Sequence, residues 1–412
     1  MTRFLLVLVF CTYFLPLAAQ RQCVSGEYAE TIKSKFPHEQ QARVQSESTD
    51  DANYNTPDTA TITIPVVIHV VYFSNEQNIS LQQIQSQLDA LNKDFNGQTT
   101  DLQKIPAYFK PLAAGAGVRF ELAKKDPQGF STSGINRIKT TKRYFKDDDQ
   151  VKFTTSSGAD AWDASKYLNI WVCDLDLNLM GYASFPGGPA NRDGVVIDYK
   201  VFGTAPYVSG AYNKGRTLVH ELGHWLGLKH LWGDYWCGDD GIADTPPQQK
   251  GSRGCPSGEI FSCGTTSHGD MYMNFMDFTD DACMYTFTAG QRAAMRSNFK
   301  PGGYMYALTQ SDAARSEGIA KAPLPETSTE PQATPSIRLF PNPVQGKLTL
   351  DLKSEVPAYT TLQVFNHMGQ QIFQQQISQT VTTISTSQFK PGIYFVQLKG
   401  NAGEWREKFV KM

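Results

Sequence analysis

The 412-residue sequence lacks an excess of charge of either sign. It contains 38 Lys and Arg residues against 40 Asp and Glu residues. A protein that binds nucleic acid through a basic surface normally carries a clear positive excess, and an acidic interaction tail would show as a negative run. We therefore expect no nucleic-acid partner.

Long apolar runs are also scarce. The run from Phe4 to Leu17 follows Arg3 and is shorter than the roughly 20 residues that span a bilayer. Small residues at 18–19 then precede polar sequence, which favours a signal peptide over residues 1–19, cleaved after Ala19, above the alternative of a membrane anchor. No later run reaches membrane-spanning length, so we expect an exported protein without a stable membrane span.

Cysteine is sparse, with seven residues in the chain. One lies in the apolar leader (Cys11) and one in the polar stretch that follows it (Cys23), which leaves an odd number for the mature region: Cys173, Cys237, Cys255, Cys263 and Cys283. Cys173 sits in an apolar strand and is expected to be a buried thiol. The other four allow three pairings, between which sequence alone does not decide.

What the sequence does contain is enough apolar material for a core, at 40% hydrophobic and 12% aromatic residues. At about 150 residues per domain, the length predicts two to three units. Residues 20–55 are polar and cannot form a core of their own, 56–308 are expected to form a central domain, and 309–335 a proline-containing linker. Residues 336–412 form short alternating segments, typical of a small all-β sandwich.

The first part of the central region alternates between strand and helix patterns. Residues 62–72 predict a strand buried on both faces. Leu81, Ile84, Leu88, Leu91 and Phe95 follow the spacing of an amphipathic helix, which Ser80 caps. Residues 118–122, 167–175 and 194–197 predict further strands, so we expect an α/β layer up to about residue 200.

The most informative motif is a set of three histidines. Residues 216–226 have helical composition, so His220 and His224, four apart, can present nitrogens to one ion. His230 would lie too far along a continuing helix. Gly227 permits a turn with positive φ that brings His230 back. Three neutral imidazoles and an open fourth position favour a catalytic zinc ion.

Glu221 follows the first histidine and points beside the expected metal. It is predicted to act as the general base on a zinc-bound water and then to protonate the departing amine. The alternatives are histidines with purely structural roles and a structural zinc site closed by a fourth protein ligand. The motif favours metal-assisted amide hydrolysis over both.

The motif from His220 to His230 resembles the metzincin zinc endopeptidases. Residues 239–246, 273–278 and 287–291 further resemble the pappalysin family, over about residues 62–299. This resemblance implies an α+β fold, a twisted sheet with helices and an irregular C-terminal subdomain. It also implies that Met276 lies in the turn beneath the metal. The family usually has a tyrosine two residues later, where this chain has Phe278.

The same resemblance implies further ligands and pairings. It places Ca²⁺ at Asp240, Asp244 and the Thr245 carbonyl, in an oxygen-rich loop whose alternative is a solvated acidic turn. It pairs Cys237 with Cys263 and Cys255 with Cys283. It also makes Cys23 a zinc ligand in a latent form, although Val24 stands where the family has glycine, and Gly26 comes two residues late. The alternative is a leader cysteine without a role.

The C-terminal segments at 339–343, 392–396 and 407–411 resemble the sorting domain of the type IX secretion system of Bacteroidetes. The alternative is a carbohydrate-binding or adhesive sandwich. The sorting reading implies passage through the periplasm and outer membrane, with the secretion machinery as partner and a secreted or cell-surface location.

These observations together predict a secreted zinc metalloendopeptidase that acts on proteins or peptides and is made as a latent zymogen. Residues 20–55 would be its pro-segment and 56–308 its catalytic domain. The alternative is an inactive metal-binding adhesin or peptide-binding module on the same scaffold. Asp280 and Asp281 follow the expected methionine turn and favour Arg or Lys after the scissile bond; the alternative is that both face solvent.

Overall fold

The computed structural model describes residues 23–35, 60–176, 178–264, 268–316, 318–319, 337–352, 361–366, 370–400 and 403–412. The chain divides into two compact units, Met1–Lys321 and Ala322–Met412. Each unit is described by itself. The predicted signal peptide, its cleavage site and Cys11 lie outside the described residues. Within the described part, no helix is long and apolar enough to cross a membrane.

A mixed six-stranded sheet forms the centre of the first unit, in the order β3-β1-β5-β7-β6 with β4 also paired to β1. All neighbours are parallel except β6, which runs antiparallel to β7. The strands are β1 (Ile62–Tyr72), β3 (Val118–Leu122), β4 (Ile135–Lys139), β5 (Leu168–Cys173), β6 (Gly181–Ala183) and β7 (Val195–Asp198). The three predicted strands beyond residue 100 correspond to β3, β5 and β7.

Strand β1 is buried on both faces, as its β-branched run predicts. Ile64 and Val66 belong to the main core that contains α2, whereas Val67 and Val71 belong to smaller clusters. The sheet is therefore an interior layer with packed material on each side.

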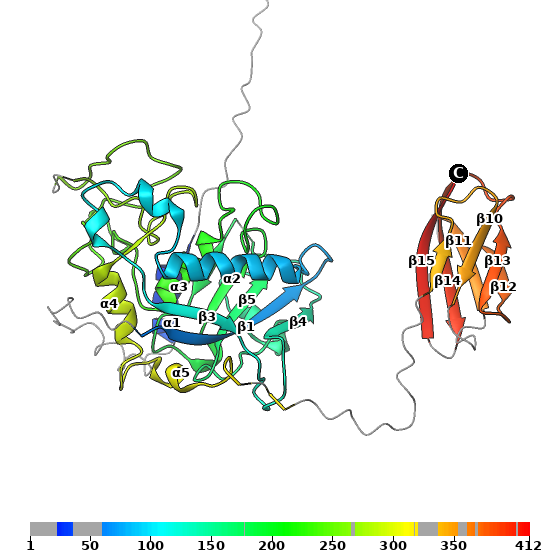
Figure 1. Ribbon diagram of the computed structural model, residues 1–412, viewed down its shortest axis with the longest axis horizontal. Coiled ribbons are helices and arrows are strands. Elements are labelled where there is room, and N and C mark those ends of the chain that lie inside the picture. The colour runs from blue at the N-terminus through cyan, green and yellow to red at the C-terminus, as the bar shows by residue number, and fades with distance from the viewer. Residues whose placement is uncertain are drawn as a thin grey trace, which may run out of the picture. The chain divides into compact units, whose positions relative to one another are not determined.

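Helix α2 (Leu81–Phe95) begins at Ser80, whose hydroxyl accepts a hydrogen bond from the Gln83 N–H at 3.1 Å. Its apolar stripe from Ile84 to Phe95 is buried, as predicted. Leu81 is the exception: it is 54% exposed, because it lies in the first turn, before the helix reaches the core. Helix α3 (Arg216–Trp225) packs against α2, and both lie over the sheet in Figure 1.

After α3 the unit consists mostly of loops, which Figure 1 shows in green to yellow. This matches the irregular C-terminal subdomain that the resemblance implies. The regular elements there are β8 (Phe287–Thr288), paired with β2 (Ala113–Ala114), and the helices α4 (Ala289–Ser297) and α5 (Tyr306–Gln310). Short 3₁₀ turns occur earlier as η2 (Thr100–Lys104), η3 (Lys110–Leu112), η4 (Gln150–Lys152), η5 (Thr154–Ser156) and η6 (Ala190–Arg192).

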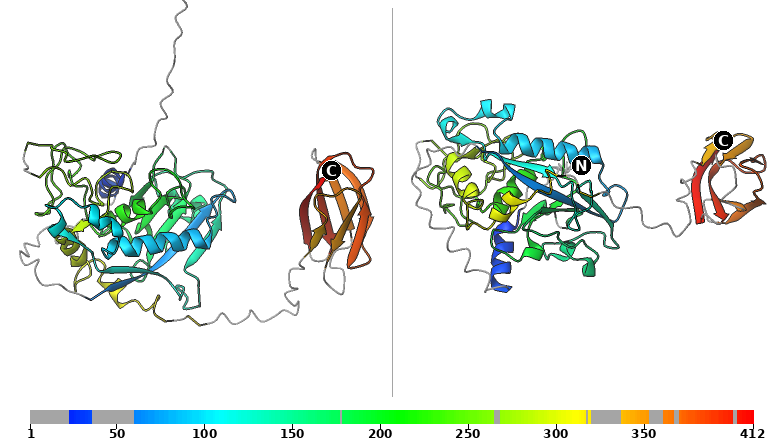
Figure 2. Two further views of the ribbon diagram at one scale, coloured as in Figure 1. Left: turned by 45° about the horizontal axis from the view of Figure 1, so that its top comes forward. Right: turned by 60° about the horizontal axis from the view of Figure 1, so that its bottom comes forward.

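Helix α1 (Ser25–Lys35) belongs to the predicted pro-segment. It contacts β6, the strand at the edge of the sheet, and Figure 2 shows it well apart from α2. Its buried residues, such as Tyr28, pack against the rest of the first unit. The segment thus uses the core of its neighbour, as expected of a stretch too polar to form one.

The described start of the expected linker, residues 309–316 and 318–319, differs from the prediction. Ala313 and Ala314 are buried, and the Ala313 carbonyl accepts a hydrogen bond from the Lys124 N–H at 2.7 Å. These small side chains pack within the first unit, so the linker begins later than residue 309. Most of its remainder lies outside the described residues.

The second unit is an antiparallel β-sandwich, as predicted. Its two sheets have the orders β13-β10-β9 and β12-β11-β14-β15. The core between them includes Leu348, Val364, Val396 and Phe409. The strands are β9 (Arg338–Phe340), β10 (Lys347–Asp351), β11 (Thr361–Asn366), β12 (Gln371–Gln376), β13 (Val381–Ser385), β14 (Gly392–Gly400) and β15 (Gly403–Lys411).

Candidate metal centre and active site

Helix α3 carries the first two histidines on one buried face. The Nδ1 atom of His220 lies 2.7 Å from the Phe275 carbonyl oxygen, and that of His224 lies 2.8 Å from the Leu228 carbonyl oxygen. A carbonyl oxygen only accepts, so each Nδ1 carries the proton and donates it. Both Nε2 atoms are therefore left with a lone pair directed into the site.

The chain reverses at Gly227, which ends α3 with a φ of 94°. The Leu228 N–H donates back to the Gly223 carbonyl at 2.9 Å, which holds the turn. His230 thereby returns to the site, and its Nδ1 lies 2.5 Å from Asp234 Oδ1. The helix stop inferred from the histidine spacing is present in the structure.

The three Nε2 atoms converge on one point. His224 Nε2 lies 3.1 Å from both His220 Nε2 and His230 Nε2. Burial, and after it His230, lowers the pKa of His224 to about 3, so its ring is neutral. Three ring nitrogens that face one another at this distance suit a shared cation. Zn–N bonds of about 2.0–2.1 Å in a tetrahedral site would place the nitrogens about 3.3 Å apart, so the residues fit zinc.

Cys23 completes this cluster. Its sulfur and the three histidine nitrogens all lie within 4.8 Å of one another, and all four residues are buried. Burial and the Glu221 carboxylate raise the pKa of the Cys23 thiol, an effect that a cation at the histidines would oppose. Among the described residues, no other His, Cys, Asp and Glu side chains form such a metal-binding group.

Glu221 lies beside the cluster, almost fully buried. Its Oε2 accepts a hydrogen bond from the Ser25 hydroxyl at 2.8 Å and lies 3.5 Å from Cys23 Sγ. The Ser25 oxygen in turn accepts one from the Ala183 N–H of β6 at 3.0 Å. The start of α1 thus occupies the space between the carboxylate and the edge of the sheet.

The floor of the site contains Met276, which is fully buried. A Cβ atom on Gly223 would overlap the Met276 sulfur, so the glycine between the two histidines allows this close approach. The ring of Phe278 lies 4.8 Å from that of His230 and 5.6 Å from that of His220, measured between centroids. Phe278 therefore borders the metal position, without a hydroxyl to offer.

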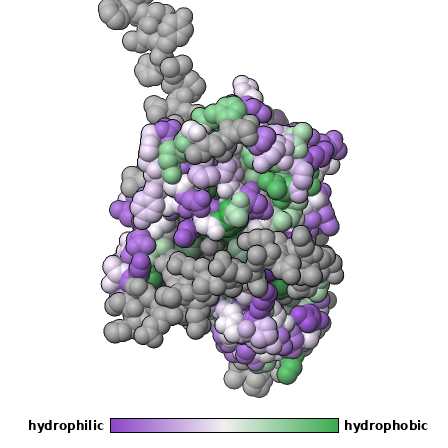
Figure 3. Space-filling view, turned by 90° about the vertical axis from the view of Figure 1, so that its left-hand side faces the viewer, coloured by the Kyte–Doolittle hydropathy of each residue, from purple (hydrophilic) through white to green (hydrophobic). Residues whose placement is uncertain are grey.

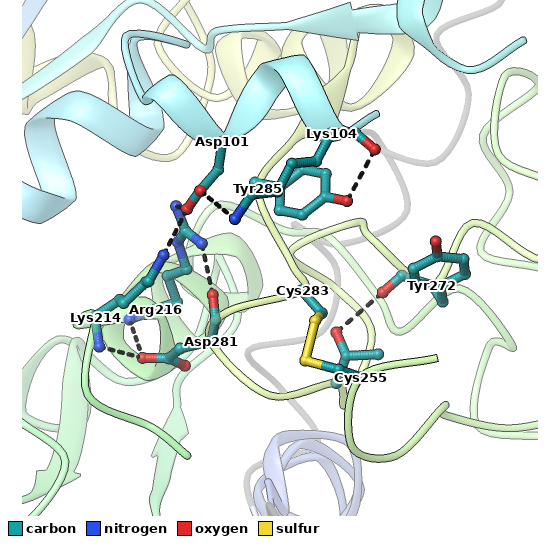
Figure 4. Close-up of a disulfide and its surroundings, with 10 residues drawn as sticks. Asp101, Lys104, Lys214, Arg216, Cys255, Tyr272, Asp281, Cys283 and Tyr285 are labelled. Atoms are coloured by element: carbon teal, nitrogen blue, oxygen red, sulfur yellow. Dashed lines mark hydrogen bonds and ion pairs between the residues drawn. A yellow bond between two sulfur atoms is a disulfide. The ribbon is translucent and has the colours of Figure 1, made fainter. Parts of the chain in front are cut away.

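A buried polar cluster fixes the start of α3 (Figure 4). Asp281 Oδ2 accepts hydrogen bonds from the N–H groups of Lys214 and Arg216 at 2.8 and 3.1 Å. The Arg216 guanidinium also pairs with Asp94 and Asp101 at 3.1 and 2.8 Å. Asp281 is therefore a structural residue with no exposure, and the expectation that it selects a basic substrate side chain is wrong. Asp280 is half-buried.

Two disulfides tie the loops after α3. The structure joins Cys237 to Cys263 and Cys255 to Cys283, the pairing that the resemblance implies; Figure 4 shows the second. Cys173 is a buried free thiol. Each bridge closes a loop of moderate length, for which about 2–4 kcal/mol of stabilisation is typical.

The acidic loop after the zinc motif is only partly arranged like a calcium site. Asp240 Oδ1 accepts hydrogen bonds from the Thr245 hydroxyl at 2.7 Å and the Ile242 N–H at 3.0 Å. Asp240 Oδ2 is buried without a hydrogen-bond partner, and burial raises the pKa of this carboxyl to about 7. The Asp244 carboxylate instead accepts bonds from Thr288 and Gly290 at the start of α4.

Two residues of the site were not anticipated from sequence. Ser25, which contacts Glu221, carried no signal, because serines are common in polar segments and this one lies 196 positions away. Asp234 did carry a signal, because a carboxylate four residues after the third histidine is a candidate partner for that ring.

Two regions of the chain match known protein families. Residues 148–300 match the family described as pregnancy-associated plasma protein-A, and residues 338–412 match the secretion system C-terminal sorting domain. An extracellular metalloprotease of Colletotrichum graminicola is 31% identical over 266 residues, which cover 62% of this chain and 82% of the relative.

Solved structures of mirolysin are also similar. A mutant of Tannerella forsythia promirolysin is 43% identical with a TM-score of 0.64, covering 70% of this chain and 97% of that one. Mature mirolysin with a cleaved peptide is 47% identical with a TM-score of 0.60, covering 62% and 97%. With its three-histidine zinc site and its sorting domain, this secreted chain belongs to the pappalysin family of zinc metalloproteases.

Proposed function

We propose that this protein is a zinc-dependent endopeptidase, that Glu221 is its general base, and that the Cys23 segment keeps it latent. The observation that carries the proposal is the convergence of three histidine nitrogens on one point, with Glu221 and Cys23 beside it. The zymogen form is supported by the similarity to promirolysin.

The ligands of the metal would be His220, His224 and His230, joined by Cys23 in the latent state. When bound, zinc supplies Lewis-acid polarisation of the scissile carbonyl and a lower pKa for water. Glu221 accepts the proton from the attacking water and passes it to the departing amine. The backbone of β6, whose Ala183 N–H is donated to Ser25 in the latent form, becomes free to bind an extended substrate.

Latency follows from what the pro-segment occupies. The Cys23 sulfur would fill the coordination position that water needs. Ser25 donates to the Glu221 oxygen that lies nearest to Cys23, so the base is engaged as well as the metal. Removal of the segment would release both groups together.

The test compares Glu221→Gln with the wild type after removal of the pro-segment. Loss of the carboxylate should lower hydrolysis of a denatured protein such as casein by about 10²-fold or more, since general acid–base groups typically contribute 10²–10⁴. Zinc content should stay at one per chain. The matched control is Glu259→Gln, an exposed glutamate.

Hydrolysis at the wild-type rate by Glu221→Gln would refute the assignment of the base. Absence of zinc from the wild type would refute the metal site. Zinc binding without hydrolysis of any peptide by the wild type would favour the adhesin alternative.

We further propose Ca²⁺ at Asp240, Asp244 and Thr245. The buried, unpartnered Asp240 Oδ2 supports this, since an oxygen in that position is a suitable ligand for a hard cation. Calcium should raise the melting temperature of the wild type, and Asp240→Asn should remove that increase. An unchanged increase in the variant would contradict the site.

The C-terminal unit is proposed to engage the type IX secretion machinery as its partner. Its match over residues 338–412 supports this role. Deletion of this unit should retain the enzyme inside the cell, with the activity of the processed enzyme unchanged.

A further inference from the structure

The three histidines differ in what holds their second nitrogen. His220 and His224 each donate to a backbone carbonyl, whereas His230 donates to the side chain of Asp234. Only this third partner is a negatively charged group. It is also the only one of the three that a point mutation can remove.

The His230 ring is held on two sides. Trp232 stacks on it with 4.5 Å between the ring centroids and 3° between the planes, which fixes the ring plane. The Asp234 hydrogen bond fixes rotation within that plane. The turn that carries both is closed by the Gly233 N–H, which donates to the His230 carbonyl at 2.8 Å.

One carboxylate oxygen of Asp234, Oδ1, faces His230, and the other, Oδ2, faces the pro-segment. Its side chain is 42% exposed, and Gly26 of α1 approaches it closely. A Cβ atom on Gly26 would lie 2.5 Å from Asp234 Oδ2 and 3.0 Å from its Cγ. A side chain at Gly26 would therefore push the carboxylate away from His230 or lift the pro-segment.

We infer that Asp234 is a positioning residue for His230 and that Gly26 keeps the pro-segment compatible with this role. Asp234 holds the ring so that Nε2 faces the metal, and the absence of a Cβ at Gly26 lets α1 lie over the carboxylate undisturbed. The inference rests on the proposed role of His230 as a zinc ligand.

The backbone conformation at Gly26 does not itself require a glycine. The φ of Gly26 lies outside the left-handed region, so an alanine there meets no backbone penalty. Helix propensity also does not favour glycine over alanine at this position in the first turn of α1. Any loosening caused by Gly26→Ala must then come from the clash with Asp234, since neither the backbone conformation nor propensity favours the glycine.

The first experiment measures zinc retention by the full zymogen against a graded chelator, with metal content as readout. Asp234→Ala should weaken retention about 10- to 100-fold, the usual effect of removing such a partner. Asp234→Asn, which keeps an acceptor oxygen without the charge, should lie between alanine and wild type. Asp147→Ala, at an exposed aspartate, is the control and should match wild type.

Melting temperatures in excess zinc show whether each variant folds. If the wild type retains zinc and a folded Asp234→Ala retains it equally well, the inference is wrong and the proposed function stands. If the wild type and the control retain no zinc, the proposed function fails first.

The second experiment tests the coupling between Gly26 and Asp234. The rate at which Cys23 reacts with a thiol reagent reports how often the pro-segment lifts, because Cys23 is buried. Gly26→Ala should raise this rate at least severalfold when Asp234 is present and much less in the Asp234→Ala background. Equal effects in both backgrounds would show that Gly26 acts independently of Asp234 and would overturn the coupling.

Discussion

At the scale of single residues, this site differs from the usual family pattern at Phe278, where the family usually has a tyrosine. Its ring packs in T-shaped contacts against the stacked pair of His230 and Trp232, with its centroid 4.8 Å from that of His230 and 4.9 Å from that of Trp232. The Arg253 guanidinium lies 4.7 Å from the centroid of the same ring. The Phe278 side chain itself has no hydrogen-bond donor, so charge that develops on the substrate oxygen receives no help from this side chain.

Phe278→Tyr should raise kcat, because a phenol hydroxyl could donate to the developing oxyanion. One such donor is typically worth about 10²–10³ in kcat, and a position not adapted to it should recover about tenfold. Steady-state kinetics on a peptide substrate, together with zinc content, give the measurement. A change confined to KM would show that the hydroxyl meets the substrate only before the reaction.

Some residues of the metal site can be predicted from local sequence, and others cannot. His220, His224 and Gly227 follow from helix geometry, because four residues make about one turn and glycine permits the reversal. Ser25 depends on where α1 docks, which no local pattern encodes. Asp281 looked available for substrate because its sequence neighbourhood does not show that two N–H groups of the α3 start bind it.

At the scale of elements, the pro-segment helix is fastened at a second point. The Tyr28 hydroxyl lies 2.8 and 3.0 Å from the two oxygens of Asp149. Asp149 is buried and pairs with Lys152 at 3.0 Å and Arg192 at 2.6 Å. The aspartate therefore stays paired within the catalytic unit even without Tyr28.

Tyr28→Phe should consequently weaken the hold of α1 without unfolding the enzyme. A hydrogen bond to a charged group is worth about 1.5–3 kcal/mol, which corresponds to more frequent opening by about tenfold or more. The rate of Cys23 modification in the zymogen measures this, with the exposed Tyr144→Phe as control. A rate unchanged from wild type would mean that the anchor contributes nothing to latency.

The pH dependence of this anchor follows from Asp149. Burial raises the pKa of its carboxyl, but the charges of Lys152 and Arg192 lower this pKa by a larger amount. The resulting pKa lies below the ordinary value of about 3.9. The contribution of the ionised group is present above that value and is lost as the pH falls through the lower folded-state pKa. The effect of Tyr28→Phe should therefore be constant from pH 5 to 8. A loss of the effect near pH 6 would contradict this.

The N-terminus of α3 provides another prediction. Asp281→Ala removes the acceptor of two N–H groups, and loss of such a cap costs about 0.5–2 kcal/mol. Thermal unfolding should show this destabilisation, whereas profiling of cleavage sites should show the same preference after the scissile bond. A changed preference would show that Asp281 contributes to the substrate pocket after all.

Elements with a clear apolar pattern were predictable, including short strands such as β7, whereas β4 and β6 were not. The β1 and α2 patterns extend over 11 and 15 residues, long enough for burial to select the side chains. Strand β6 has three residues, and β4 is only partly buried, so neither shows a recognisable alternation. Both depend on pairing with strands distant in sequence.

At the scale of the whole molecule, the two units have separate cores. The face of the molecule in Figure 3 shows apolar residues in small patches among polar ones. The boundary of the first unit was misjudged because alanine-rich sequence is equally common in linkers, and only the burial of Ala313 and Ala314 distinguishes it.

Separate cores predict separate responses to metal removal. Chelation should lower the melting temperature of the catalytic unit, since a ligand that binds only the folded state stabilises it. The transition of the C-terminal unit should not move. Calorimetry with and without chelator measures both, and a shift of both transitions together would indicate that the units unfold as one.

The burial of Cys23 has a consequence for the direction of activation. While α1 is docked, the sulfur lies among the histidines and is shielded from oxidants. Once the segment leaves, its lone thiol is exposed outside the cell, where oxidation removes the thiolate. A detached pro-segment would thereby lose its capacity to rebind zinc, and its release would become irreversible.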